Sequence, residues 1–255
     1  MGRGPVIERQ KQATAKERGK VFAIHGKLIA IAAAKGADPT QNVSLADAIY
    51  KAKKENVPND NIDRAIKRGA GLEKGAAAIE EVVYEGYGAG GVAVIVKALT
   101  DNRNRTAPSM RHAFSKCGGS LGETGSVSNF AFKFVGQIQI PGPINDALEE
   151  TIIESGADDY GSEGEIIYIQ TSWHELGHVT AFLKGKGIEI LASHGEYLAT
   201  NTTELSEFDK ALKVHILIET LEEDEDVEAV WHNAVITPEI QAEIIKHLES
   251  HRFRT

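Results

Sequence analysis

The sequence predicts an α+β protein in which a small helical N-terminal domain precedes two small ferredoxin-like α/β domains. Apolar residues recur at helical spacing as far as residue 68. After the Gly- and Ala-rich segment 69–78, short β-branched runs alternate with helical patterns. Two successive sets of strands and helices of this length are typical of split β-α-β domains. A chain of 255 residues is long enough for two or three such domains.

The N-terminal part is predicted to contain an arm and three helices. Residues 3–20 carry six basic and two acidic side chains with little apolar periodicity, so we expect an extended arm. Apolar residues at helical spacing predict a first helix over residues 21–35. The second should begin at Ser44, with Asp47 completing a weak capping box. The third is predicted over residues 60–68.

The rest of the chain is predicted to alternate strands with helices, because β-branched and alternating runs are separated by helical patterns. The predicted strands cover residues 81–84, 92–99, 126–132, 133–140, 165–170, 188–192 and 227–236. The predicted helices cover residues 103–116, 144–155, 173–184, 206–221 and 238–251.

A glycine-rich turn separates the first two strands. Gly86, Gly88 and Gly91 fit G-x-G-x-x-G, the dinucleotide-binding pattern, which requires a strand before it and a helix after it. Here a strand follows the glycines. We therefore interpret the turn as a hairpin loop in which Gly86, Gly88, Gly90 and Gly91 allow positive φ values.

The segment after the second strand is rich in hydrogen-bond donors. Asp101-Asn102 is typical of a helix N-cap. Arg103 and Arg105 follow at the point where a chain that leaves a sheet meets solvent, so we expect them to bind a partner. The alternative is that each guanidinium pairs with a neighbouring acid and braces the fold.

Three motifs resemble the central block of the YebC/PmpR family. They are YEGYGAGGVAVIV, LTDNRNRT and RHAFSKCGGSLGETGSV, which follow one another within residues 84–127. Weaker similarity extends to both sides, in VPNDNIDRAIKRGAG and LEEDEDVEAVWHNA. The resemblance implies a gene-expression factor rather than an enzyme, and the mitochondrial members of the family are translational activators for cytochrome oxidase.

The resemblance also implies a domain map in which the second domain is discontinuous and the third is inserted within it. On this map the basic helical domain with its arm covers residues 1–76, the second domain 77–132 plus 201–240, the inserted domain 133–200 and a C-terminal helix 241–255.

Composition excludes several classes of protein. The chain has no run of eighteen apolar residues, so we expect no membrane span, and residues 1–10 lack the apolar core of a signal peptide. The only cysteine is Cys117, which excludes an internal disulfide and suits the reducing cytosol, so we expect a cytoplasmic protein. Two glycines follow Cys117 and place it at a helix C-terminus, where we expect a structural role.

The charge of the chain is unevenly distributed. Residues 1–76 hold 15 Lys and Arg against 8 Asp and Glu, a net charge of +7, whereas residues 77–255 hold 13 against 29, a net charge of −16. This asymmetry indicates a basic module that attracts phosphates, although solvated helix faces would explain it too. The candidate nucleic-acid-binding residues are Lys11, Lys16, Arg18, Lys20, Lys27, Lys51, Lys53, Lys54, Arg64, Lys67, Arg68, Arg103 and Arg105.

One motif resembles a zinc site. His174, Glu175 and His178 form a literal H-E-x-x-H, in which two histidines bind zinc and the glutamate acts as base. However, Ser172 and Glu175 also form a capping box, and Lys184 stands where the longer metalloprotease pattern has a third histidine. We therefore expect no metal and no cofactor, and a zinc metalloprotease is a remote alternative.

The leading hypothesis is a nucleic-acid-associated regulator of gene expression, either a DNA-binding transcriptional regulator, a ribosome-associated translational activator, or both. The expected partners are DNA or ribosomal RNA and the ribosome, with no membrane, no small-molecule substrate and no enzymatic activity. The alternative is a protein-interaction module that docks through its acidic body. The acidic run Glu222 to Asp226 lacks the spacing of a calcium loop, so we interpret it as a solvated turn.

Overall fold

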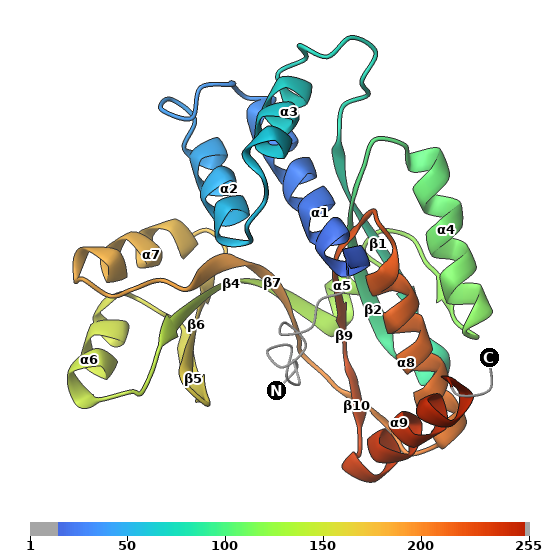
Figure 1. The fold of residues 1–255 in the computed structure, drawn as a ribbon. Helices are drawn as coiled ribbons and strands as arrows, with labels where there is room; N and C mark the ends of the chain where they lie inside the picture. Colours follow the sequence, from blue (N-terminus) through green and yellow to red (C-terminus); the bar gives the residue numbers. More distant parts are fainter. Residues whose placement is uncertain (1–14, 253–255) are drawn as a thin grey trace. The chain divides into compact units, whose positions relative to one another are not determined.

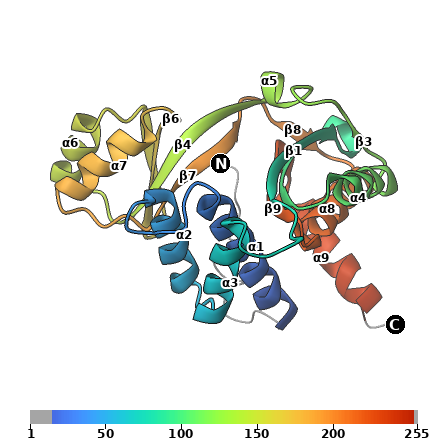
Figure 2. The ribbon, with the colours of Figure 1, turned by 90° about the horizontal axis from the view of Figure 1, so that it is seen from above.

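Three helices form the N-terminal part of the chain. The computed structural model describes the backbone of residues 15–252 and the side chains of residues 17–250. The helices lie side by side in two perpendicular views (Figure 1, Figure 2). They are α1 (Ala15–Ala33), α2 (Val43–Lys54) and α3 (Asn59–Gly69).

The first helix begins earlier than predicted. Most of the predicted arm lies outside the described residues, but residues 15–20 are helical and belong to α1. Lys20 in this added stretch donates a hydrogen bond to the backbone carbonyl of Glu222. Lys20 and Glu222 are 202 positions apart, and their contact helps to hold the first turns of α1, where the apolar periodicity is weak.

The second helix has a different cap from the predicted one. The Asn42 side chain accepts a hydrogen bond from the Leu45 N–H at 3.1 Å, so Asn42 is the N-cap and the Ser44 capping box was wrong. The Asn42 amide also donates to the carbonyls of Ala32 and Gly36 at 2.8 and 2.7 Å. Asn42 therefore ties the start of α2 to the end of α1.

The three helices enclose a hydrophobic core of their own. Gly69 lets two backbones approach closely, because a Cβ at this position would lie 2.1 Å from the carbonyl oxygen of Ala30. The buried core residues are Ile29, Ala32, Ala33, Leu45, Ala52, Val57, Ile62 and Ala65.

A four-stranded antiparallel sheet follows the helices, with the strand order β3-β1-β2-β9. Two further short strands, β8 and β10, pair in parallel beside it. The bounds are β1 (Glu80–Tyr87), β2 (Ala93–Thr100), β3 (Ser120–Leu121), β8 (Thr203–Leu205), β9 (Val227–His232) and β10 (Ala234–Ile236).

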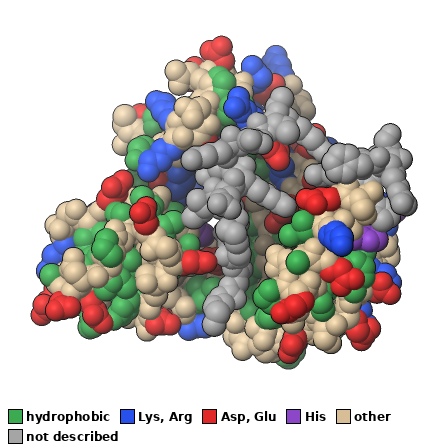
Figure 3. Space-filling view, turned by 60° about the horizontal axis from the view of Figure 1, so that its bottom comes forward, with side chains coloured by type: hydrophobic (Ala, Val, Ile, Leu, Met, Phe, Trp, Pro, Cys, Tyr) green, Lys and Arg blue, Asp and Glu red, His purple; other side chains and the backbone are tan. Residues whose placement is uncertain are grey.

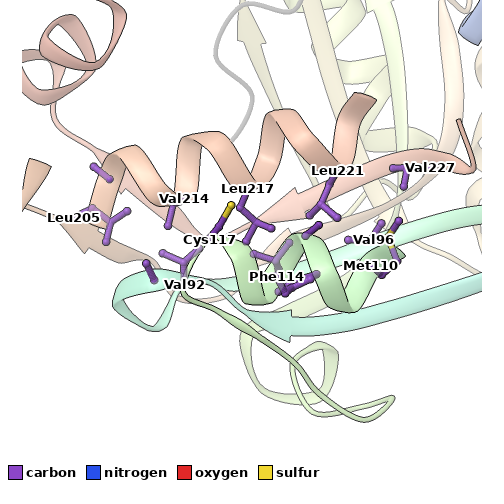
Figure 4. Close-up of a cluster of buried hydrophobic side chains, with 14 of the residues drawn as sticks. Val92, Val96, Met110, Phe114, Cys117, Leu205, Val214, Leu217, Leu221 and Val227 are labelled. Atoms are coloured by element: carbon purple, nitrogen blue, oxygen red, sulfur yellow. The ribbon is translucent and has the colours of Figure 1, made fainter. Parts of the chain in front are cut away.

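Two helices cover one face of this sheet and create its core (Figure 4). They are α4 (Arg103–Lys116), which has the predicted bounds, and α8 (Phe208–Glu223). Asn102 caps α4 as predicted, since its side chain accepts from the Arg105 N–H at 3.2 Å. The helix α9 (Pro238–Arg252) adds the buried Ile244. The side chains labelled in Figure 4 that form this core are Val92, Val96, Met110, Phe114, Cys117, Leu205, Val214, Leu217, Leu221 and Val227.

The glycine-rich turn joins β1 and β2 as the predicted hairpin loop, through the short 3-10 helix η2 (Ala89–Gly91). Positive φ values occur at Gly90 (73°) and Gly91 (77°), but the same prediction was wrong for Gly86 and Gly88. Gly86 is needed for a different reason. It lies within β1, where a Cβ would be 2.5 Å from the carbonyl oxygen of Ser120.

A buried carboxylate shapes the segment after β3. Glu85 of β1 is 3% exposed and accepts hydrogen bonds from the N–H groups of Gly125 (2.9 Å) and Val127 (2.8 Å). These bonds hold the segment in a turn that leads into the short helix α5 (Ser128–Ala131). The strand predicted over residues 126–132 was therefore wrong.

Residues 128–201 form a second unit with a ferredoxin-like topology. Its four antiparallel strands have the order β5-β6-β4-β7, and one helix crosses between β4 and β5 and another between β6 and β7. The bounds are β4 (Phe132–Pro141), α6 (Asp146–Glu154), β5 (Asp159–Glu163), β6 (Ile166–Ser172), α7 (Leu176–Gly185) and β7 (Ala192–Ala199).

Some elements of this unit differ from the prediction. The strand predicted over residues 188–192 was wrong, because Ile188 and Ile190 contact the hydrophobic core from a connecting segment and β7 pairs with β4 only beyond them. α7 begins three residues late, since β6 stays paired with β4 as far as Ser172. The strands β3, β5 and β8 were missed because they are short and polar.

The predicted fold class is confirmed: a helical N-terminal part is followed by two α/β domains, and the third domain is inserted in the second. The described parts of residues 1–127 and 202–255 form one compact unit, and residues 128–201 form the other. The finer domain boundaries stay predictions. None of the described helices is long and apolar enough to cross a membrane.

Candidate nucleic-acid interface

Exposed cations gather on α2 and α3. Lys53 and Lys54 in the last turn of α2, and Arg64 and Lys67 on α3, are all exposed. No residue with a described side chain forms an ion pair with any of these four. Their helices bury the opposite sides in the helical core, so these cations face outward. We call these four residues the open cations.

Other candidate cations of the N-terminal part differ from the open cations in their partners or their position. Lys51 pairs with Asp47, with 2.9 Å between Nζ and Oδ2. Arg18 is exposed on the first turns of α1. Lys11 and the side chain of Lys16 lie outside the described residues.

An aromatic residue that the sequence analysis missed lies beside the open cations. Tyr50 of α2 is 58% exposed, and Lys54 Nζ lies 5.1 Å from the centroid of its ring. Bases of single-stranded nucleic acid stack on aromatic side chains of this kind. The sequence did offer a signal for this residue, because Tyr50 directly precedes the lysine-rich end of α2.

Two further lysines are engaged by the turn between α8 and β9. Lys27 Nζ lies 2.7 Å from Asp226 Oδ1 and donates to the carbonyl of Glu225 at 2.8 Å. Lys20 donates to the carbonyl of Glu222. Both lysines therefore contact the acidic run rather than open solvent.

Asp226 is the centre of a buried polar network. It is 6% exposed, and its carboxylate accepts from Thr106 Oγ1 at 2.7 Å and from Arg105 Nη2 at 2.9 Å, as well as from Lys27. Burial by itself would raise the pKa of Asp226, but the hydrogen bonds from Lys27, Thr106 and Arg105 outweigh it and lower the pKa to about 2. The prediction of a solvated turn was therefore wrong for Asp226.

The arginines of the second motif also lie next to carboxylates. Arg105 Nη2 is 3.1 Å from Asp101 Oδ1, and Arg68 Nη2 is 2.8 Å from Oδ2 of the same residue. Arg103 donates from Nε to Glu80 Oε2 at 2.6 Å. The side chains of Arg103 and Arg105 nevertheless remain 62% and 57% exposed. Their role as partner-binding residues stays a prediction.

Comparison with known proteins identifies the family. Residues 4–72 match the family described as TACO1/YebC protein N-terminal domain, and residues 79–234 match TACO1/YebC second and third domain. The chain belongs to the TACO1/YebC family. The resemblance of the three central motifs is thereby confirmed.

Relatives of this TACO1/YebC protein carry a consistent name. A probable transcriptional regulatory protein of Hathewaya histolytica is 46% identical over 234 residues, which cover 89% of this chain and 93% of that protein. One of Clostridioides difficile is 44% identical, with 91% and 98% covered. A crystal structure of a conserved hypothetical protein from Aquifex aeolicus is similar with a TM-score of 0.77 and 41% identity, covering 87% and 91% of the two chains.

The H-E-x-x-H sequence does not form a helical histidine pair in this TACO1/YebC protein. α7 begins at Leu176, so His174 and Glu175 precede the helix and only His178 lies within it. All three side chains are exposed. The Glu175 N–H donates to Ser172 Oγ at 3.3 Å, but Glu175 is itself the N-cap of α7 and makes no side-chain capping bond, so the predicted capping box of Ser172 and Glu175 was wrong. Within the described residues, no group of three or more His, Cys, Asp and Glu could hold a metal ion.

Cys117 lies at the C-terminal end of α4, as predicted from the two glycines that follow it. Its side chain is part of the sheet core and is 4% exposed. Burial raises the pKa of the Cys117 thiol, and Lys116 only partly opposes this effect. A protonated, buried thiol is typical of a structural cysteine.

Proposed function

We propose that this TACO1/YebC protein regulates gene expression in the cytoplasm by binding nucleic acid through its N-terminal helices. The observation that carries the proposal is the group of open cations on α2 and α3, which have no described acidic partner. Relatives named as probable transcriptional regulatory proteins support a regulatory role. The nucleic acid is either DNA at a promoter or ribosomal RNA, so the protein acts as a transcriptional regulator, a ribosome-associated translational activator, or both.

The charge distribution supports this location for the binding surface. Residues 1–76 carry a net charge of +7 in a chain whose total is −9. On the face drawn in Figure 3, Asp and Glu side chains are scattered over the visible surface, which would repel phosphates. Long-range Coulomb attraction between the basic helices and the phosphates therefore favours encounters in which nucleic acid meets the helical part first. Tyr50 adds a ring on which an unpaired base can stack.

Measurement of affinity for a labelled RNA oligonucleotide and for duplex DNA tests the proposal. The double variant Lys53→Ala/Lys54→Ala should weaken binding. On DNA it should also reduce the slope of log affinity against log salt by roughly 0.9 for each phosphate that the protein no longer neutralises. The matched control is Lys213→Ala/Lys246→Ala, which removes the same charge from exposed positions on α8 and α9.

Equal weakening by both double variants would show that only net charge matters, and would contradict a binding surface on α2 and α3. Failure of the unaltered protein to bind either nucleic acid at low salt would contradict the proposed function itself. Crosslinking in cells, followed by identification of the recovered nucleic acid, then decides between promoter DNA and ribosomal RNA.

A second candidate function is binding of a basic protein partner by residues 128–201. This segment holds 3 Lys and Arg against 11 Asp and Glu, a net charge of −8. Phe134 and Trp173 are 40% and 47% exposed, with ring centroids 5.1 Å apart. Exposed aromatic rings on an acidic domain suit a cationic peptide. Loss of partner capture by Trp173→Ala, with nucleic-acid binding unchanged, would separate the two functions.

A further inference from the structure

Two arginines converge on one partly exposed carboxylate. Arg68 of α3 and Arg105 of α4 both contact Asp101, with 2.8 Å and 3.1 Å between the guanidinium nitrogen and the carboxylate oxygen. The three side chains are 32%, 57% and 33% exposed, so solvent reaches all of them. Arg68 and Arg105 are 37 positions apart in sequence but share this one anion.

The arrangement of the two arginines is typical of a phosphate site. Guanidinium groups bind phosphate oxygens through paired N–H donors, and they do so in the same geometry in which they bind a carboxylate. A carboxylate of the chain can therefore occupy the place of a phosphate. Neither arginine uses all of its donors on Asp101. Arg68 Nη2 also donates to the carbonyl of Ala77 at 3.4 Å, and the buried Arg68 Nε has no hydrogen-bond acceptor among the described residues.

A second carboxylate anchors Arg105, because Arg105 Nη2 contacts both Asp101 and Asp226. Asp226 is buried and holds Arg105 through hydrogen bonds at 2.9 and 3.2 Å. Asp226 also binds Lys27 and Thr106, so it is a fixed part of the fold. Asp101, in contrast, is exposed and lies on the short link between β2 and α4, outside both elements.

We propose that Arg68 and Arg105 form a phosphate-binding site that Asp101 occupies until a phosphate group of the bound nucleic acid displaces it. The site deepens the proposed function and rests on it. Asp101 is then a competitive intramolecular ligand that lowers the affinity for nucleic acid and makes non-specific binding weaker. Asp226 positions Arg105 for this exchange and is not itself displaced.

The test compares Asp101→Asn with Glu243→Gln, an exposed carboxylate on α9. Each variant removes one negative charge, so general Coulomb attraction to a labelled RNA oligonucleotide or duplex DNA changes similarly. Release of the two arginines should make Asp101→Asn bind roughly three- to tenfold more tightly than Glu243→Gln. The slope of log affinity against log salt should also become steeper by roughly one unit.

The double variant Asp101→Asn/Arg68→Ala provides the second readout, because it removes one arginine of the exposed pair. The tightening should then disappear. Thermal unfolding of each variant checks that the fold is retained.

If the unaltered protein binds nucleic acid but Asp101→Asn and Glu243→Gln bind with equal affinity, the inference is overturned. The proposed function then stays intact. Tightening that persists in the double variant would also overturn it, because the gain would not pass through Arg68. No binding by the unaltered protein would instead contradict the proposed function.

Discussion

Replacement of Asp226 by asparagine should destabilise the unit that contains α1, α4 and β9. The substitution keeps the size of the side chain but removes the negative charge to which Lys27 and Arg105 are bound. Because the pKa of Asp226 is lowered from 3.8 to about 2, the charged carboxylate stabilises the folded state by about 2 kcal/mol at pH 7. Asparagine also leaves a buried network partly unsatisfied, so we expect a loss of about 2–4 kcal/mol.

The pH dependence of this loss follows from the direction of the pKa shift. A carboxylate whose folded pKa is lowered stabilises the protein above its unfolded pKa, and the contribution disappears as the pH falls through the folded pKa. For Asp226 the window therefore lies between about pH 5 and pH 2, and roughly half of the charge contribution should remain at pH 3. The difference between the parent and the Asp226→Asn variant should shrink accordingly.

Urea unfolding followed by tryptophan fluorescence measures this effect. The chain has two tryptophans, Trp173 in the inserted unit and Trp231 in β9. A Trp173→Phe background leaves Trp231 as the reporter of the unit that contains Asp226. Glu243→Gln serves as the control for loss of one charge. If Asp226→Asn unfolds at the same urea concentration as this control at pH 7, or if the difference does not shrink toward pH 3, the network does not stabilise the fold as argued.

Three further outcomes are expected. Glu85→Gln should cost about 1–3 kcal/mol, because the part-buried N–H of Gly125 and the buried N–H of Val127 lose a charged acceptor. Faster hydrogen exchange at these two amides would show this loss, and unchanged protection would contradict it. Gly86→Ala should destabilise the protein strongly, because its Cβ would lie 2.5 Å from a backbone oxygen. Gly177→Ala is the control, because a Cβ at this position of α7 would have no atom within 4 Å. In thermal unfolding it should be neutral or stabilising by up to about 1 kcal/mol. Millimolar nicotinamide and adenine nucleotides should leave the melting temperature unchanged, since the glycine turn is a hairpin; a rise of several degrees would refute that interpretation.

Several features of this protein follow from local sequence alone. The bounds of α4 and the first residue of α9 agree with the prediction, because an asparagine cap and a proline after threonine act within a few residues of the helix end. The hairpin between β1 and β2 was predictable from glycines that precede a β-branched run. The basic character of the N-terminal part was also found by counting charge.

What the sequence could not decide was which charged groups meet. Asp226 lies 121 positions from Arg105 and 199 from Lys27, and no local pattern distinguishes it from the other acids of its run. Glu85 likewise accepts a hydrogen bond from Gly125, 40 positions away, and holds that segment in a turn. For this reason the strand predicted over residues 126–132 does not form. Local capping and periodicity act over one or two helical turns. The sequence therefore determined the helices, the hairpin and the basic character of the N-terminal part. Only the tertiary structure separated the open cations from those held by carboxylates, because that separation depends on distances between atoms brought together by folding.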